Sequence, residues 1–462
     1  PNSVKDFYEN SIRLNNNIVL EGGSDVAGFR LSYNNRLFTL PMPNTRKMDH
    51  IVNLKGYANI TPKLSVTTNL NFLSVEQVGA QNEGYASDNA SNFNQWWQRQ
   101  LDMNKLKEYK TSTGGFNSWN IRSPTDLRPA YWNNPFFEAY ESYPRDYSNR
   151  IYGDLGVSYK ITNDLKASVI FRANVLNYFN DGRTGSGGLN QAYYGVTNGM
   201  TGEYNEEFLL EYRHRFGKFG VEQYVGGNMR QDFRRQTNAN TVGGLSVPGL
   251  YSLTASVDRP TVGNTWSSYN LNSIYARGTF DWNQLIFLDY SVRNDVSSSL
   301  PYDVNGYIYP SVSASFVFSD LLKSGGIGNV LSFGKLRGAW GRVGSDLGAY
   351  VLNQSYALGT SYGSFPTMSV PTTIYDADIK PSLSTEFEVG TELQFFKNRL
   401  GFDFSVYRKD GKDQIIPLST TPSSGAGSVY INAGLIRSQG WDLIVNATPI
   451  KSGDFKWDLT FN

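Results

Sequence analysis

Four carboxylates on two neighbouring segments are spaced so that they could take part in acid–base chemistry. Glu386, Glu388 and Glu392 stand at even spacing in one segment, and Asp403 lies in the next. At a period of two, such side chains share one face of a β-strand. Paired carboxylates can act as acid and base in glycoside hydrolysis, but the polar face of a strand is also carboxylate-rich simply because it meets water. We therefore predict wall residues of a polar lumen and no catalytic residue.

Other common reactive groups are scarce. The chain has no cysteine, and His50 and His214 are its two histidines. This composition excludes disulfides and thiolate ligands and argues against a multi-histidine metal centre. Lys and Arg number 42 against 41 Asp and Glu, so the chain lacks the basic footprint of a nucleic-acid-binding protein. The sequence therefore predicts a protein that is not an enzyme, with no metal site, no cofactor and no nucleic-acid partner.

Aromatic residues gather in a polar stretch between Glu76 and Asn149. Its tryptophans stand among Asn, Gln and Ser, and we take four of them as candidate ligand contacts: Trp96, Trp97, Trp119 and Trp132. A flat ring offers apolar area to the face of a sugar, while amide side chains supply directional hydrogen bonds. The same rings would also suit packing within the loop or contact with another protein. These alternatives stay open.

The elements that position these residues are predicted to be β-strands. Apolar side chains alternate with polar ones from Leu64 to Phe72, and again from Phe387 to Phe395. About sixteen such segments occur, most of them near the ten-residue length of a tilted membrane strand. They begin near Asn17, Gly28, His50, Leu64, Arg150, Leu165, Glu206, Phe219, Tyr269, Gln284, Ile308, Phe333, Leu383, Arg399, Ile436 and Phe455.

Composition fits an all-β membrane protein better than a helical one. Aromatic residues make up 14% of the chain, charged residues 18%, and Gly is frequent at 45. No apolar run approaches the roughly 18 residues that a membrane-spanning helix needs. Aromatics near segment ends, such as Tyr57, Trp282 and Trp457, fit an interfacial girdle. The alternative that the aromatics fill a soluble β-core stays open here.

The connections between segments alternate in length. Gly217-Lys218 and Lys397-Asn398 have the composition of hairpin turns. Long links of about 70, 27, 35 and 39 residues separate the hairpins, at 76–149, 179–205, 234–268 and 344–382, far above ordinary loop lengths. Outer-membrane barrels have short periplasmic turns and long extracellular loops. The sequence therefore predicts a transmembrane antiparallel β-barrel that is closed either as a sixteen-stranded porin or with further strands.

Several stretches in order resemble the SusC/RagA-like TonB-dependent outer-membrane transporters of Bacteroidetes. The first is LEGGSDVAGFRLSYNN (20–35), and later ones are YPSVSASFVFSD (309–320) and KLRGAWGRVGSD (335–346). The most specific is IKPSLSTEFEVGTELQFFKNRLGFDFSVYRKDGKDQII (379–416), which INAGLIRSQGWDLIVNATPI (431–450) follows. The ordered series spans most of the chain.

This resemblance implies a barrel of 22 strands, of which residues 1–462 would hold about sixteen. It implies that the N-terminal plug domain, the TonB box and the final barrel strands lie outside this sequence. It also implies TonB-dependent import of an oligosaccharide or a peptide, with a SusD-like surface lipoprotein as partner. Glu386, Glu388, Glu392 and Asp403 would then face the plug. A passive porin or a surface-adhesin barrel without energy coupling is the alternative.

Overall fold

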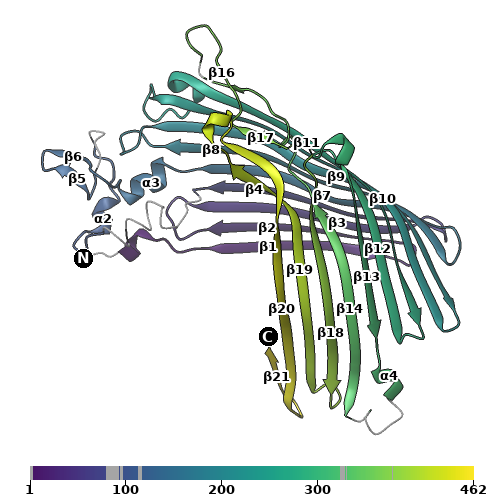
Figure 1. The fold of residues 1–462 in the computed structure, drawn as a ribbon. Helices are drawn as coiled ribbons and strands as arrows, with labels where there is room; N and C mark the ends of the chain where they lie inside the picture. Colours follow the sequence, from purple (N-terminus) through teal and green to yellow (C-terminus); the bar gives the residue numbers. More distant parts are fainter. Residues whose placement is uncertain are drawn as a thin grey trace. The chain divides into compact units, whose positions relative to one another are not determined.

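The computed structural model has an antiparallel, strand-rich fold (Figure 1). It describes residues 4–79, 93, 97–112, 117–322, 328, 330–359, 361–376 and 378–462. Within these ranges, seventeen strands belong to one sheet, and two small sheets have two strands each. No helix in this described part is long and apolar enough to cross a membrane. The all-β class predicted from the alternation is confirmed.

Sixteen strands of the large sheet are hydrogen-bonded neighbours in chain order. Each of the sixteen predicted segments coincides with one of them. The strands are β1 (Arg13–Gly23), β2 (Ala27–Thr39), β3 (Arg46–Asn59), β4 (Leu64–Val78), β7 (Arg145–Lys160), β8 (Leu165–Thr184), β9 (Tyr193–Phe216), β10 (Phe219–Leu245), β11 (Ser256–Trp282), β12 (Ile286–Ser297), β13 (Gly306–Phe316), β14 (Leu331–Ser345), β18 (Ser382–Phe395), β19 (Leu400–Ser419), β20 (Ser428–Ser452) and β21 (Phe455–Phe461). The seventeenth, β17 (Thr373–Tyr375), pairs in parallel with β20.

Short elements lie in the connections. The helical ones are η1 (Val4–Phe7), α2 (Met103–Leu106), α3 (Pro135–Glu141), η3 (Leu253–Ala255), η4 (Tyr302–Val304), α4 (Ser319–Leu322) and η6 (Pro422–Ser424). The small sheets pair β5 (Ile121–Ser123) with β6 (Asp126–Pro129), and β15 (Ala357–Leu358) with β16 (Met368–Ser369). The α3 helix begins at Pro135 because proline suits a first helical position and the Asn134 side chain accepts a hydrogen bond from the Phe136 backbone N–H.

The hairpin turns are as tight as their sequences predict. Between β9 and β10, Gly217 has a φ of 59°. Between β18 and β19, Lys397 and Asn398 have φ values of 57° and 65°. Successive left-handed residues match the twist of paired strands, which is why Gly and Asn are favoured in such turns. These turns fix the register of each hairpin at one end of the sheet.

Two of the predicted long links are mostly strand, so their predicted lengths were wrong. β8 continues to Thr184 and β9 begins at Tyr193, leaving only residues 185–192 between them. β10 and β11 are each 27 residues long and leave only residues 246–255 as their connection. A membrane barrel needs about ten residues per strand to cross the apolar layer. Beyond that layer both faces of a strand meet water, and the alternation that revealed the strand disappears.

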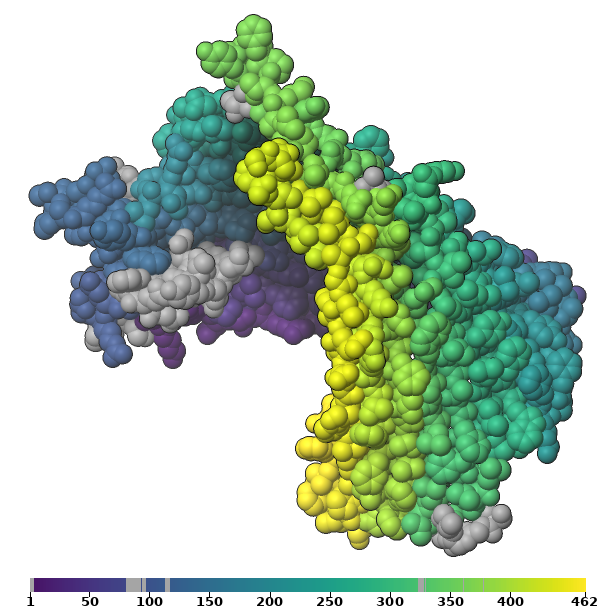
Figure 2. Space-filling model, in the orientation of Figure 1, coloured from purple at the N-terminus to yellow at the C-terminus, as the bar shows by residue number. Residues whose placement is uncertain are grey.

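The other two long links are confirmed. Residues 79–144 connect β4 to β7 and contain α2, α3 and the β5–β6 hairpin. Residues 346–381 connect β14 to β18 and contain β15, β16 and β17. In Figure 2 part of the second connection projects at the top of the picture in light green.

The chain divides into two compact units. The first comprises Pro1–Gly156, Phe171–Tyr204 and Asp232–Ser267, and the second comprises Val157–Ile170, Asn205–Gln231 and Ser268–Asn462. The first unit contains a compact apolar core, which the connection 79–144 builds together with η1 and the β2–β3 connection; its buried members are Phe7, Met42, Met103, Leu106 and Phe136. The second unit contains the hairpin that carries the four predicted carboxylates.

Apolar side chains on one face of the strands are exposed. In the second unit, Ile274 is 63% exposed, Phe387 55% and Trp441 66%. A soluble sheet would bury such a face against a second layer. Exposed apolar residues at every second strand position are what a lipid-facing sheet requires.

Candidate functional site

The predicted carboxylates share the polar face of the β18–β19 hairpin. Glu392 lies directly opposite Asp403 in the register, and Glu386 lies opposite Lys409. Glu386, Glu388 and Glu392 alternate with the apolar Phe387, Val389 and Leu393 along β18. The structure therefore brings together on one face the four residues that the sequence indicated.

Arg337 on β14 joins two of these carboxylates. Its Nη2 atom lies 2.8 Å from Asp403 Oδ1, and its Nε atom lies 3.5 Å from Glu388 Oε1. One guanidinium can serve two carboxylates because it presents five donors in a planar fork. Sequence reasoning missed this residue, although Lys335 and Arg337 alternate with Leu336 in the same pattern that marked the carboxylates.

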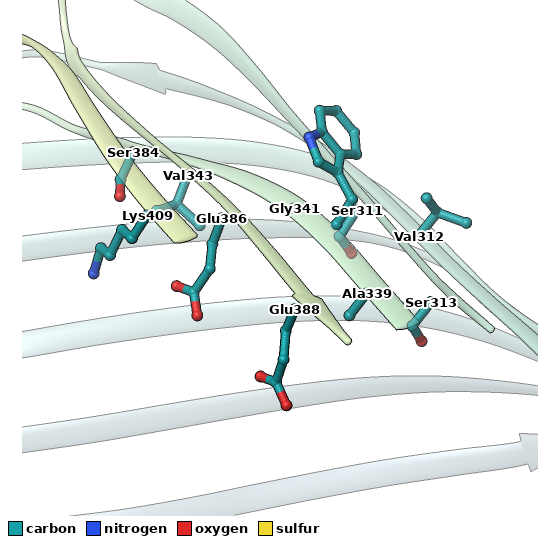
Figure 3. Close-up of a pocket in the computed structure, with 11 residues that line it drawn as sticks. Ser311, Val312, Ser313, Ala339, Gly341, Val343, Ser384, Glu386, Glu388 and Lys409 are labelled. Atoms are coloured by element: carbon teal, nitrogen blue, oxygen red, sulfur yellow. The ribbon is translucent and has the colours of Figure 1, made fainter. Parts of the chain in front are cut away.

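A hollow of about 310 Å³ lies on this polar face. Small residues of β13 and β14 line it, among them Ser311, Ser313 and Gly341. Figure 3 shows Glu386 and Glu388 extending from β18 on the same side, with Lys409 next to Glu386. Short side chains leave the space, and the charged side chains surround it.

A second hollow of about 400 Å³ shares the Ser311 and Ser313 lining. Its far side is formed by Glu222, Tyr224 and Arg277. The Arg277 guanidinium lies 4.6 Å from the centre of the Tyr224 ring, and the Tyr224 hydroxyl accepts a hydrogen bond from Arg213. Through this shared lining the two hollows form one depression over β10–β14 and β18–β19 with charged side chains at its edges, which we call the inner depression.

The inner depression suits reversible polar contacts rather than bond breaking. Arg277 of its lining lies over the Tyr224 ring, and Glu388 of its lining is paired with Arg337. Its hydroxyls bond to neighbours: Asp289 accepts hydrogen bonds from Thr279 and Ser313. Among the residues that the structure describes, no group of three His, Cys, Asp or Glu side chains could hold a metal ion. Solvated, mutually paired charges fit a wall along which polar molecules move.

The candidate tryptophans have different surroundings. Trp97 and Trp119 lie against the apolar core of the first unit, with ring centres 5.3 Å apart and an edge-on contact. Trp132 is half-buried and is outside that set of packed residues. Trp96 lies outside the described residues. The role of all four in ligand contact stays a prediction.

Burial and a carboxylate stabilise the neutral form of Tyr109 in this core. The Tyr109 hydroxyl donates a hydrogen bond of 3.0 Å to Glu141 Oε1. Desolvation, and next the hydrogen bond to Glu141, raise the pKa of Tyr109 well above its usual value. The hydroxyl therefore stays a donor across physiological pH and ties the segment after α2 to the end of α3 within the connection 79–144.

Asp346 secures the base of the connection 346–381. This residue follows the last residue of β14, and its Oδ2 atom accepts hydrogen bonds from the hydroxyls of Tyr269 at 2.8 Å, Ser299 at 3.2 Å and Ser297. The Ser297 side chain is fully buried. One carboxylate oxygen thus joins β11, β12 and the start of the connection.

We expect Asp346→Ala to loosen this connection. Three hydroxyls would lose a charged acceptor, and each such bond contributes about 1.5–3 kcal/mol. Proteolysis between 346 and 381 on intact cells should become at least about tenfold faster, since cleavage of a locally opened segment follows its open population. Asp346→Asn, which keeps a side-chain oxygen acceptor, should change the rate less. Equal cleavage rates in wild type and Asp346→Ala would contradict this role.

Comparison with known proteins identifies the family. The family model described as TonB dependent receptor-like, beta-barrel matches residues 95–462. This match covers well over half of the chain. The chain belongs to this family. The resemblance inferred from the ordered segments is thus confirmed, as are the barrel fold and the location in the outer membrane, and the chain is not an enzyme.

Individual relatives cover parts of the chain. TonB-dependent receptor P26 of Formosa agariphila is 22% identical over 354 residues, which are 71% of this chain and 34% of that protein. TonB-dependent receptor SusC of Bacteroides thetaiotaomicron is 26% identical over 206 residues, 42% of this chain and 20% of SusC. The chain thus matches about a third of the length of the first of these relatives and a fifth of the second.

A solved structure shares the fold. The RagAB peptide importer in its open-open state superimposes with a TM-score of 0.80 at 16% identity. The superposition covers 99% of this chain and 50% of that one. At this identity the likeness concerns the fold alone.

Proposed function

We propose that this TonB-dependent receptor barrel imports a nutrient, an oligosaccharide or a peptide, across the outer membrane with energy delivered through TonB. The observation that carries the proposal is the inner depression, which charged side chains border and which lies behind an apolar, exposed face on the same strands. Membership in the family supports the coupling to TonB. Relatives whose names include SusC and a peptide importer support the substrate class.

The proposal assigns roles to the wall residues. A barrel of this strand number would be an open channel unless a plug filled it. We assign residues 1–462 to the barrel domain, with a plug domain and the final strands supplied by the longer protein. Glu386, Glu388, Glu392 and Asp403 would face the plug, and Arg337 would hold two of these carboxylates in place. A SusD-like surface lipoprotein is the proposed partner on the extracellular side.

Deleting the TonB box from the full-length protein tests the energy coupling. Uptake of the nutrient should be abolished while the amount of protein in the outer membrane stays the same. Undiminished uptake would refute active coupling. A passive porin would instead give steady conductance in planar bilayers from the complete protein without a partner.

Substitution of single tryptophans tests the cargo contacts. We expect Trp132→Ala to weaken cargo binding about tenfold, the equivalent of about 1.4 kcal/mol, because its half-buried ring lies outside the packed core. Trp119→Ala serves as the comparison, since it removes a ring that packs on Trp97 and should chiefly lower the folded yield. Cargo titrations on purified protein at equal folded concentration would measure both. An unchanged affinity for Trp132→Ala would exclude Trp132 from the cargo site.

A further inference from the structure

Basic residues gather on the apolar side of the second unit, opposite the inner depression. Because side chains alternate along a strand, Arg408 and Lys412 of β19 point away from the face that carries Asp403 and Lys409. Strand register places Arg342, Thr385, Asp410 and Arg437 side by side in one row across β14, β18, β19 and β20. We call Arg342, Arg408, Lys412 and Arg437 the basic rim.

On the side of the basic rim toward the tight turns, the adjacent rows of side chains across these four strands are largely apolar. Register places Trp340 and Phe387 beside Arg408. The next row contains Val389, Val406 and Trp441, and Phe404 and Leu443 lie in the row after it. Val406 is 44% exposed and Trp441 66% exposed, so this surface lacks a covering layer of protein in the described chain. The surface of these four strands is coloured green to yellow in Figure 2.

The basic rim lies at the height of a membrane boundary. Thr385 is ten positions from Phe395, the last residue of β18 before the tight turn. Ten residues span about 33 Å along a strand, which a tilt of about 40° reduces to about 25 Å across the membrane. This equals the height of the apolar band of an outer-membrane barrel. The rim lies toward the long connections, on the extracellular side.

Two arginines of the basic rim stay partly exposed although they form ion pairs. Asp410 accepts hydrogen bonds from Arg437 Nε at 2.7 Å and from Arg408 Nη2 at 2.9 Å. The two arginine side chains are nonetheless 45% and 51% exposed. Arg342 donates a hydrogen bond from Nη2 to the Ile308 carbonyl oxygen at 3.5 Å, and its buried Nε atom has no hydrogen-bond partner in the described part of the chain. Four cations with one carboxylate leave a strongly positive surface directly above an apolar one.

We propose that the basic rim binds the phosphate groups of an anionic lipid in the outer leaflet. Guanidinium groups match phosphate oxygens with paired, charge-assisted hydrogen bonds. The acyl chains of the same lipid would cover Phe387, Val406 and Trp441, which free phosphate would leave bare. Apolar coverage and charge complementarity therefore both identify a lipid as the occupant. This inference goes beyond the proposed transport function and does not depend on it.

Binding of lipid A with two phosphates to the purified full-length protein tests the proposal. Native mass spectrometry would measure lipid occupancy across a titration. Arg342→Gln with Lys412→Gln leaves the Arg408–Asp410–Arg437 ion pairs intact, and should weaken binding about 5-fold per cation, or about 25-fold together. Lys397→Gln with Lys456→Gln removes the same charge near the turns at the opposite end of the strands and should leave binding unchanged. Equal affinity in the rim variant and wild type would overturn the proposal.

A second variant and two competitors complete the test. Arg408→Gln, Asp410→Asn and Arg437→Gln together remove the rim's guanidinium pair without leaving a carboxylate unpaired, and should also weaken lipid binding at least 5-fold. Lipid A stripped of its phosphates should bind wild type and variants equally weakly. Inorganic phosphate should displace no more lipid than sodium chloride of equal ionic strength. Displacement specific to phosphate would mean a site for soluble anions, and tight binding of the stripped lipid would mean apolar adsorption; either result would overturn the proposal.

Discussion

Gly153→Val should prevent assembly of the sheet at β4 and β7. A Cβ atom added at Gly153 would lie 2.0 Å from the carbonyl oxygen of Asn69 and 2.9 Å from the Cα atom of Leu70. Both obstacles are backbone atoms of β4, so no rotamer change relieves the collision. Backbone shifts forced by overpacking typically cost 1–3 kcal/mol, and here the shift would break a strand pair. We expect the folded yield in the outer membrane to fall at least about tenfold.

The β4–β7 contact has side-chain bonds that would be lost as well. The Thr68 hydroxyl donates to the Asp154 carbonyl at 3.0 Å, and the Asn71 amide donates to the Tyr152 carbonyl at 3.3 Å. Gly182→Val on β8 is the matched control, because a Cβ atom there would meet nothing within 4 Å. The fraction of protein that resists unfolding by SDS without heating would measure both variants. A wild-type folded fraction for Gly153→Val would show that β4 and β7 do not approach this closely.

The alternation of apolar and polar residues predicts the strands because a membrane strand has lipid on one face and water on the other. Leu64, Leu165, Phe219 and Phe455 were predicted strand starts and begin β4, β8, β10 and β21. Each follows a turn whose residues favour tight reversal, so two independent signals coincide there. The start of β9, the end of β10 and the start of β11 lie away from the tight turns and have no such signal. Water on both faces removes the periodicity, and only pairing with a neighbouring strand reveals them.

The sequence predicts which side chains of the candidate site share one face of a strand. It does not predict which side chains on neighbouring strands contact them. Glu386, Glu388 and Glu392 share a face because of the period of two alone. That Arg337 reaches Glu388 and Asp403 depends on the stagger of β14 against β18, which a single strand does not specify. The close approach of Gly153 to the β4 backbone cannot be predicted from the sequence either, since it depends on how β4 packs beside β7. Register between strands is therefore the information that the sequence pattern lacks.

Arg183→Ala should release the connections that meet around this side chain in the first unit. The Arg183 guanidinium lies between two rings, 4.8 Å from the centre of Tyr143 and 4.7 Å from that of Tyr251. It also forms an ion pair of 2.9 Å with Asp181, and the two side chains are only 9% and 8% exposed. These contacts join the end of β8 to the segment before β7 and to the β10–β11 connection.

The expected loss is large because two effects add. Desolvated cation–π contacts contribute about 2 kcal/mol each, and removal of one partner from a buried ion pair costs about 3–5 kcal/mol. Amide hydrogen exchange around Tyr143 and Tyr251 should accelerate by at least about a hundredfold, which corresponds to about 3 kcal/mol. Arg183→Lys keeps the charge for Asp181 but loses the planar stacking, and should give an intermediate rate.

A paired substitution separates the two effects. Arg183→Met with Asp181→Asn removes both buried charges, so the double variant should recover the part of the loss that comes from the unpaired carboxylate. What remains should equal the contribution of the two aromatic contacts. If Arg183→Ala alone exchanges as slowly as wild type, the stacked arginine does not hold these loops. If the double variant is as fast as Arg183→Ala, the loss comes from the rings and not from Asp181.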